Sequence, residues 1–142
     1  MIKFDIKNRF TGNVQFTAEI DCDENRPEIS KRWLAADWAL ENGIDLSGAD
    51  LRAIRFSRQD LRGIDLSGAD LRFAVLYCSS LRGANLSGAD LREADLASVE
   101  FCDANLSGAD LRGAYFLGTD FRGANLTGAK RDKRKNRKAV AS

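Results

Sequence analysis

The fold of this chain is decided by a stretch of nine residues, Ala84-Asn85-Leu86-Ser87-Gly88-Ala89-Asp90-Leu91-Arg92. The same pattern returns almost unchanged at 104–112, and at 44–52 and 64–72 with isoleucine in the first place. The copies start 20 residues apart, and each contains a shorter period of five, Ala-(Asp/Asn)-Leu-x-x. Internal repeats of this kind determine the architecture of a chain.

The period of five continues without a break from residue 44 to residue 129. If the centre of each five is position i, the 17 centres are all Leu or Phe, and most residues at i−2 are Ala. Neither a helix with its period of 3.6 nor a strand with its period of 2 keeps this pattern on one side. We therefore predict a chain that turns a corner every five residues and closes a square after 20, with i and i−2 pointing inward. Glycine at many i+2 positions suits the corners, because it adopts backbone angles that other residues avoid.

These residues resemble the pentapeptide-repeat family, whose signature is A(D/N)Lxx, over residues 44–129. The resemblance implies an all-β solenoid, namely a right-handed quadrilateral parallel β-helix, here of about four coils. At a spacing of about 4.8 Å between strands, the tube is expected to be roughly 20 Å long. The residues before the repeat are similar to the leaders of some phage and prophage members of the family.

The leader, residues 1–43, is expected to form a small α+β cap over the first coil. Apolar and charged residues alternate in 2–7 and 14–20, which predicts a β-hairpin with a turn between the two strands. A helix is predicted over 28–42 and ends at Gly43. Its expected apolar face consists of Ile29, Trp33, Ala36 and Leu40. Terminal units of solenoids often serve as caps, and contact with a partner is the alternative role for this leader.

The four faces of the predicted tube are named by their outward i−1 residues. Face one carries residues 45, 65, 85, 105 and 125, and face two residues 50, 70, 90 and 110. Face three carries 55, 75, 95 and 115, and face four carries 60, 80, 100 and 120.

On face two, Asp at i−1 and Arg at i+1 form two parallel rows, which we interpret either as a self-neutralising charge grid or as a binding stripe. Apolar side chains break the pattern around face three, and they form the candidate partner interface, Phe73, Val75, Tyr77, Tyr115 and Leu117.

The C-terminal end of the repeat has no apolar helix to cover it. An open last coil would expose backbone groups and the side chains of Phe116, Phe121 and Leu126, and two such ends stacked about a two-fold axis would satisfy each other. Family members that dimerise through their C-terminal coils support this reading. We therefore predict a homodimer through the C-terminal coil.

The tail, residues 130–142, has a net charge of +6, whereas residues 1–129 have a net charge of −5. It is expected to be disordered or weakly helical, and to act either as a solubilising end or as a nonspecific contact for nucleic acid. The candidate residues for that contact are Lys130, Arg131, Lys133, Arg134, Lys135, Arg137 and Lys138.

The chain lacks the residues that enzymes most often use. It contains no His, and its three Cys are widely spaced without a metal-ligand pattern. No Gly-rich phosphate loop occurs, and carboxylates on a convex tube have no cleft that would shift their pKa values. We expect no enzymatic activity, no catalytic residue, no metal and no cofactor. The absence of an apolar run of membrane length predicts a cytoplasmic protein without a membrane contact.

Two functions follow from these observations. The first is a rigid scaffold that binds a protein partner, and the resemblance names type II topoisomerases, which some family members bind by imitating duplex DNA. That imitation requires an acidic tube, whereas residues 44–129 hold 9 Arg against 12 acidic residues. The alternative is a nucleic-acid-associated dimeric scaffold that binds through its basic tail.

Overall fold

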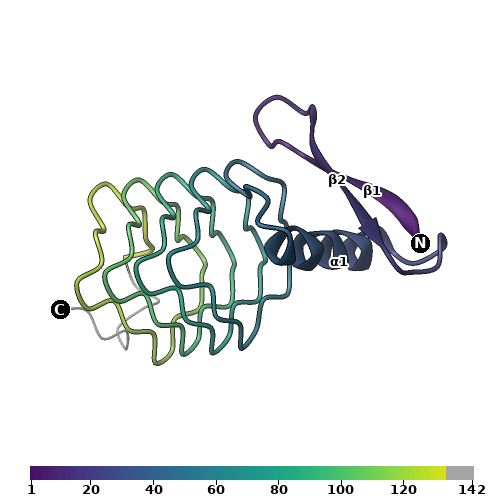
Figure 1. Cartoon of the computed structure of the whole chain (residues 1–142). Coiled ribbons are helices and arrows are strands. Elements are labelled where there is room, and N and C mark those ends of the chain that lie inside the picture. Colours follow the sequence, from purple (N-terminus) through teal and green to yellow (C-terminus); the bar gives the residue numbers. More distant parts are fainter. Residues whose placement is uncertain (134–142) are drawn as a thin grey trace.

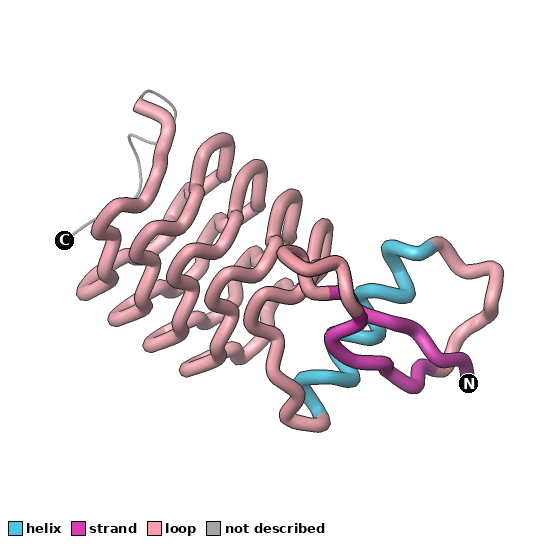
Figure 2. Tube along the Cα trace, turned by 90° about the horizontal axis from the view of Figure 1, so that it is seen from above, coloured by secondary structure: helices cyan, strands magenta, loops and turns pink. Residues whose placement is uncertain are grey.

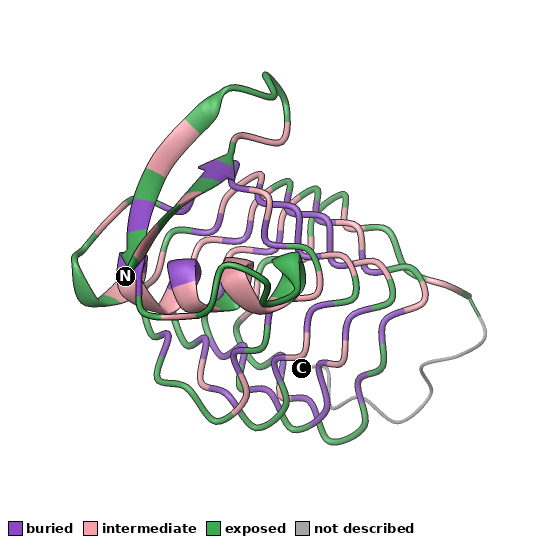
Figure 3. Ribbon diagram, turned by 90° about the vertical axis from the view of Figure 1, so that its right-hand side faces the viewer, coloured by how far each residue is buried: buried purple, intermediate pink, exposed green. Residues whose placement is uncertain are grey.

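The computed structural model describes residues 1–133 and shows a hairpin, a helix and a stack of square coils (Figure 1). The hairpin consists of β1 (Ile2–Lys7) and β2 (Val14–Ile20), and the helix α1 spans Glu28–Glu41. The repeat follows without further helices or named strands in the described residues, and its coils lie side by side along one axis (Figure 2). The helix lies at the N-terminal end of this stack (Figure 3).

Residues 20 apart stack on one another throughout the repeat, as the sequence period predicts. Parallel bridges join Asp50 to Asp70, and continue in the same column as far as Asp110 and Lys130. The Leu51 N–H donates to the Asp70 carbonyl at 2.9 Å, and the Asp70 N–H donates to the Ala49 carbonyl at 2.9 Å. These bonds give each face a short parallel ladder that satisfies the backbone between neighbouring coils.

Each corner of the coil is a tight turn whose third residue has a left-handed backbone. At the first corner the Ala49 N–H donates to the Leu46 carbonyl at 3.2 Å, and Gly48 between them has φ of 66°. All 17 residues at i+2 have positive φ, between 56° and 73°, and 10 of them are glycine. This geometry fits a type II turn, which requires a positive φ at that position. The seven exceptions are Ala53, Arg58, Phe73, Cys78, Glu93, Ser98 and Asp103.

The interior of the tube holds the residues at i and i−2, as predicted. The Leu and Phe centres from Leu46 to Phe121 are buried, and Phe101 stacks on Phe121 with ring centroids 5.3 Å apart. Small residues at i−2 let the four sides of each coil approach closely, so that the large centres fill the remaining space. One inward position departs from the prediction, because Gln59 is exposed.

The hairpin and the helix lie where the sequence predicts, but the buried face of the helix differs from the prediction. Ile29 is 49% exposed and Trp33 is 37% exposed. Of the predicted face, Ala36 is fully buried and Leu40 is half-buried, and the other fully buried residues of α1 are Ala35 and Ala39. The helix packs closely against both strands of the hairpin, where only small side chains fit, so its large apolar residues lie toward the margin.

The backbone at both ends of α1 is well defined. Pro27 precedes the first turn, where its missing N–H needs no partner. The helix ends at its C-cap Asn42, and the next residue, Gly43, has φ of 65°. In residues 1–133, no helix is both long enough and apolar enough to cross a membrane.

Candidate protein-interaction surface

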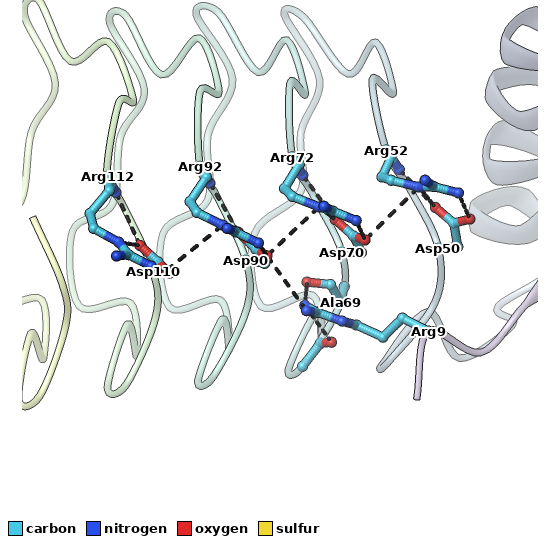
Figure 4. Close-up of polar contacts among 11 residues, drawn as sticks. Arg9, Asp50, Arg52, Ala69, Asp70, Arg72, Asp90, Arg92, Asp110 and Arg112 are labelled. Atoms are coloured by element: carbon cyan, nitrogen blue, oxygen red, sulfur yellow. Dashed lines mark hydrogen bonds and ion pairs between the residues drawn. The ribbon is translucent and has the colours of Figure 1, made fainter. Parts of the chain in front are cut away.

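Face two is a regular grid of ion pairs (Figure 4). The Arg92 guanidinium donates to Asp90 through Nε at 2.8 Å and through Nη2 at 2.6 Å. The same Nε lies 3.8 Å from the carboxylate of Asp110 on the next coil. Arg52, Arg72 and Arg112 repeat the bidentate contact with Asp50, Asp70 and Asp110.

The carboxylates of this grid lie beneath the guanidinium groups. The Asp90 side chain is 7% exposed, whereas the Arg92 side chain is 40% exposed. Burial favours the neutral form of Asp90, but the hydrogen bonds from Arg92 and the charges of Arg92 and Arg9 together outweigh burial and lower the pKa of the carboxyl below its usual value. The grid therefore neutralises itself internally, and it does not present a continuous row of carboxylates to a partner.

The N-terminal hairpin also reaches this grid, a contact that the repeat pattern does not reveal. Asn8 pairs with Ala49 of the first coil, and the following residue, Arg9, donates to the Ala69 carbonyl at 3.2 Å. The Arg9 guanidinium also lies 3.5 Å from the carboxylate of Asp90. The leader is thus tied to the side of the tube as well as to its end. Arg9 stands in a turn outside the repeat, and the only hint in the sequence is a cation between two turn signals.

Face three carries the exposed apolar side chains that the sequence indicates. Phe73 is 59% exposed, Tyr115 is 54% exposed and Leu117 is 50% exposed. Tyr77 is 39% exposed, and Val75 beside it is half-buried. The hydrogen bond with Cys78 raises the pKa of the Tyr77 phenol.

These side chains form two groups rather than one continuous patch. Val75 pairs with Asp95, which in turn pairs with Tyr115, so the two groups are separated by one coil. At about 4.8 Å per coil they lie about 10 Å apart. The intervening coil contributes the half-buried Asp95 and the buried Ala97, which form a low strip between two raised apolar rows.

The C-terminal end differs from its prediction. We expected Phe116, Phe121 and Leu126 to face solvent, but Phe116 is 3% exposed and Phe121 is 2% exposed. Their rings pack edge to face, 5.7 Å between centroids, inside the tube. Leu126 is half-buried.

The residues after the repeat continue the path of the coil for one more side. The Leu111 N–H donates to the Lys130 carbonyl at 2.8 Å, and the Asp132 carboxylate accepts from the Gly113 N–H at 2.6 Å. In the earlier coils the corresponding N–H donates to a backbone carbonyl of the following coil. At Gly113 the Asp132 carboxylate takes the place of that carbonyl. Of the candidate tail residues, Lys130, Arg131 and Lys133 belong to the described chain, and those from Arg134 to Lys138 lie outside it.

The three cysteines of the chain are free and lie in different surroundings: Cys22 is half-buried, Cys78 is exposed and Cys102 is buried at face four. Cys102 stands at i+1, which is an outward position of the predicted tube. Burial and a hydrogen bond to Asp120 raise the pKa of the Cys102 thiol, which disfavours the nucleophilic thiolate. Residues 1–133 contain no group of three or more acidic, Cys or His side chains arranged to bind a metal.

A chain of stacked square coils, with charged grids outside and Leu, Phe and Ala inside, is a β-helical solenoid. The model of the family described as pentapeptide repeats, with 8 copies, matches residues 42–72, 49–88 and 89–128. The chain belongs to the pentapeptide-repeat family, whose members fold as right-handed quadrilateral β-helices.

Solved structures of the same family are similar to this chain. A pentapeptide repeat protein from Nostoc PCC 7120 is 35% identical over 64% of this chain and 74% of its own, with a TM-score of 0.40. Another, from the cyanobacterium Cyanothece 51142, is 32% identical over 70% of this chain and 65% of its own, with a TM-score of 0.32. QnrB1, a plasmid-mediated fluoroquinolone resistance protein, is 29% identical over 61% of this chain and 57% of its own, with a TM-score of 0.24.

The chain spans less than two thirds of the last two of these proteins. A search of curated proteins found no match.

Proposed function

We propose that this chain is a non-enzymatic scaffold that binds a protein partner through face three and the adjoining Phe73 corner. The observation that carries the proposal is the exposure of Phe73, Tyr77, Tyr115 and Leu117 on a framework that is otherwise polar outside. Aromatic side chains are enriched at protein interfaces, because they bury a large area at a small cost in conformational entropy. Stacked coils hold the two raised rows at a fixed separation, so the surface is ordered before a partner binds.

The test is affinity capture from host lysate with the full chain and with the double variant Tyr77→Asp/Tyr115→Asp. Partners that bind the unchanged chain and are lost with this variant would support face three as the interface. The matched control is Ser67→Asp/Ser107→Asp, which adds the same two charges to face one and should retain every partner. Equal recovery of all proteins by both variants would contradict the proposal.

A type II topoisomerase, the partner that the family resemblance implies, fits this surface less well. DNA mimicry requires carboxylates placed like phosphates on the outside of the tube. Here the face-two carboxylates lie beneath arginine side chains that neutralise them, as the exposure of 7% for Asp90 against 40% for Arg92 illustrates. We therefore propose a partner that recognises the apolar rows of face three.

Dimerisation through the C-terminal coil is a separate proposal. The apolar surface at that end is smaller than the sequence suggests. Phe116 and Phe121 are buried within the chain. Of the three predicted residues, Leu126 is therefore the main one that could contact a second copy. Light scattering of the variant Leu126→Asp tests it, because a dimer joined at this end should dissociate.

The alternative function, nucleic-acid binding through the basic tail, draws its support from the charge of residues 130–138 alone. Gel shifts of the full chain, with and without residues 134–142 and at two salt concentrations, separate it from protein binding. Binding lost with the tail and steeply weakened by salt would favour this alternative.

A further inference from the structure

A groove of about 550 Å³ lies between the C-terminal end of α1 and the first two coils, on the side of faces four and one. Half-buried Leu40, Ile44 and Ile64 supply apolar side chains to its lining. Carboxylates of Glu41, Asp45, Asp60 and Asp65 belong to the same lining. We call it the acidic groove.

The lining of the acidic groove includes Gln59, which stands at the one corner of the repeat whose turn has no direct backbone hydrogen bond. In the other 16 corners an N–H bonds to the carbonyl three residues before it. At this corner the Gln59 N–H donates instead to the Ser79 hydroxyl at 3.0 Å, and that hydroxyl donates to the Phe56 carbonyl. Gln59 is consequently turned outward, and its inward place in the first coil is not filled by an apolar side chain.

The charge of the acidic groove is unbalanced. Four carboxylates and one guanidinium line it, and Arg62 is committed to Asp60 through a 2.6 Å contact, which leaves a net charge of −3. Within residues 1–133, neither Glu41, Asp45 nor Asp65 makes an ion pair. Asp37 lies one helical turn before Glu41, and burial followed by repulsion from Glu41 raises the pKa of its carboxyl. Asp45 and Asp65 accept hydrogen bonds within their turns, but no cation neutralises them within residues 1–133. An apolar lining with such carboxylates favours a cationic segment that also carries apolar residues.

Such a segment exists in the chain itself. Residues 130–138 contain seven Lys or Arg and one Asp, and Ala139 and Val140 follow them. The described part of this segment is held away from the groove of its own molecule. Lys130 pairs with Asp110 on face two, and Asp132 accepts a hydrogen bond from the Gly113 N–H. The groove lies on other faces, and its residue Asp65 is three coil steps, or about 14 Å, before Asn125 in the same column.

We propose that the acidic groove binds the basic segment 130–138 of a second copy of this chain, so that molecules associate head to tail. Contacts of this kind are heterologous, and they build open chains or rings instead of closed two-fold dimers. The assembly should grow with protein concentration and weaken when NaCl is raised from about 50 to about 300 mM, because the attraction is screened.

The experiment uses two full-length variants and sedimentation velocity. The groove variant is Glu41→Gln/Asp45→Asn/Asp65→Asn. Asn occupies the same column naturally at residues 85, 105 and 125, so the substitutions preserve the turn hydrogen bonds. The tail variant replaces Lys133, Arg134, Lys135, Arg137 and Lys138 with Gln. The control, Asp21→Asn/Asp23→Asn/Glu24→Gln, changes the charge equally in an exposed loop.

We expect the unchanged chain and the control to associate, and each test variant alone to remain monomeric. A mixture of the groove variant and the tail variant should form one-to-one dimers, because one molecule keeps its tail and the other keeps its groove. A two-fold contact between C-terminal ends cannot be restored in this way. The proposal is overturned if the unchanged chain is monomeric at about 100 μM, if the groove variant associates like the unchanged chain, or if the mixture stays monomeric.

Discussion

All 17 corner residues at i+2 have a positive φ, which glycine adopts easily and the other residue types do not. A residue with a Cβ atom in the left-handed region costs about 1–2 kcal/mol relative to its ordinary conformation, and seven corners accept this cost. Stacking between coils holds these corners in place, since both i and i+2 donate to the next coil, as Leu51 and Ala53 do. Stability should therefore respond to corner substitutions even where no side-chain contact changes.

We predict opposite effects for two corner substitutions. Gly83→Ala should lower the free energy of unfolding by about 1 kcal/mol, because the added Cβ meets no atom within 4 Å and only the backbone is strained. Ala53→Gly should raise it by up to about 1 kcal/mol, because Ala53 has φ of 56°. Urea unfolding measures both, and a neutral Gly83→Ala would mean that the corner relaxes elsewhere.

Asp90 is the residue at which the charge grid should contribute most. It accepts two hydrogen bonds from the Arg92 guanidinium and one from the Arg92 backbone N–H, and it lies 3.5 Å from Arg9. We predict that Asp90→Asn lowers the free energy of unfolding by about 1–3 kcal/mol at pH 7. The matched control is Asp60→Asn at an exposed pair, which should change it far less, because solvent screens that pair.

The same comparison predicts a pH dependence. The folded state lowers the pKa of Asp90, so its contribution is complete above the unfolded-state pKa of about 4 and is lost as the pH falls through the lower folded-state value. The difference between the unchanged chain and Asp90→Asn should therefore shrink below about pH 4. Arg62 lowers the pKa of Asp60 to about 2, so that pair titrates in the same direction. A difference that grows in acid would contradict this assignment.

At the scale of elements, the hairpin is held to the tube by backbone pairing and by one long side chain. The Asp50 N–H donates to the Lys7 carbonyl at 2.8 Å, and the Arg9 N–H donates to the Gly48 carbonyl at 2.8 Å. The Arg9 side chain extends past the second coil to Asp90 on the third, so it joins the leader to coils that the backbone pairing does not reach.

We predict that Arg9→Ala loosens the hairpin and leaves the distant coils unchanged. Hydrogen–deuterium exchange should become faster at the amides of Arg9 and Asp50, whereas exchange around Asp110 should stay the same, because each coil depends only on its neighbours. Arg26→Ala in the exposed loop before α1 is the control and should alter neither region. Faster exchange along the whole repeat would show that the leader stabilises the solenoid globally.

The sequence predicts the elements well and their mutual contacts less well. The period of five determines which residues lie inside, because every coil presents the same local pattern to its neighbour. The period cannot reveal Arg9, whose contacts with Ala69 and Asp90 join segments about 60 and 81 residues away. The helix illustrates the same limit, since Ile29 and Trp33 have the right spacing for a buried face but lose that place to alanines.

The candidate interface could be located from the sequence because its residues break a strict rule, as Tyr115 does at a position that is usually Asp or Asn. Its division into two rows also follows from the sequence, because Asp95 and Ala97 stand on the coil between the two groups, and Ala97 is buried there. The burial of Phe116 and Phe121, by contrast, was missed. Aromatic rings at the end of a tube can pack on one another, and the residue pattern does not show which way they turn.

For the whole molecule, the distribution of charge leads to a prediction about topoisomerases. Residues 44–129 have a net charge of only −3, and the face-two carboxylates lie under arginines. We therefore expect that DNA supercoiling by gyrase is unaffected by a large molar excess of the chain. Dose-dependent inhibition that disappears when the protein is unfolded would restore DNA mimicry as a function.

The stacking of residues 20 apart has a consequence for how this kind of gene can change in length. Loss of residues 84–103 would leave every column aligned and bring Tyr77 onto the coil next to Leu117, so that two separated rows become one. Loss of only five residues would instead move every later side chain to the neighbouring face. Insertions and deletions of a whole coil can thus alter the spacing of a binding surface in steps of about 4.8 Å while the interior stays the same.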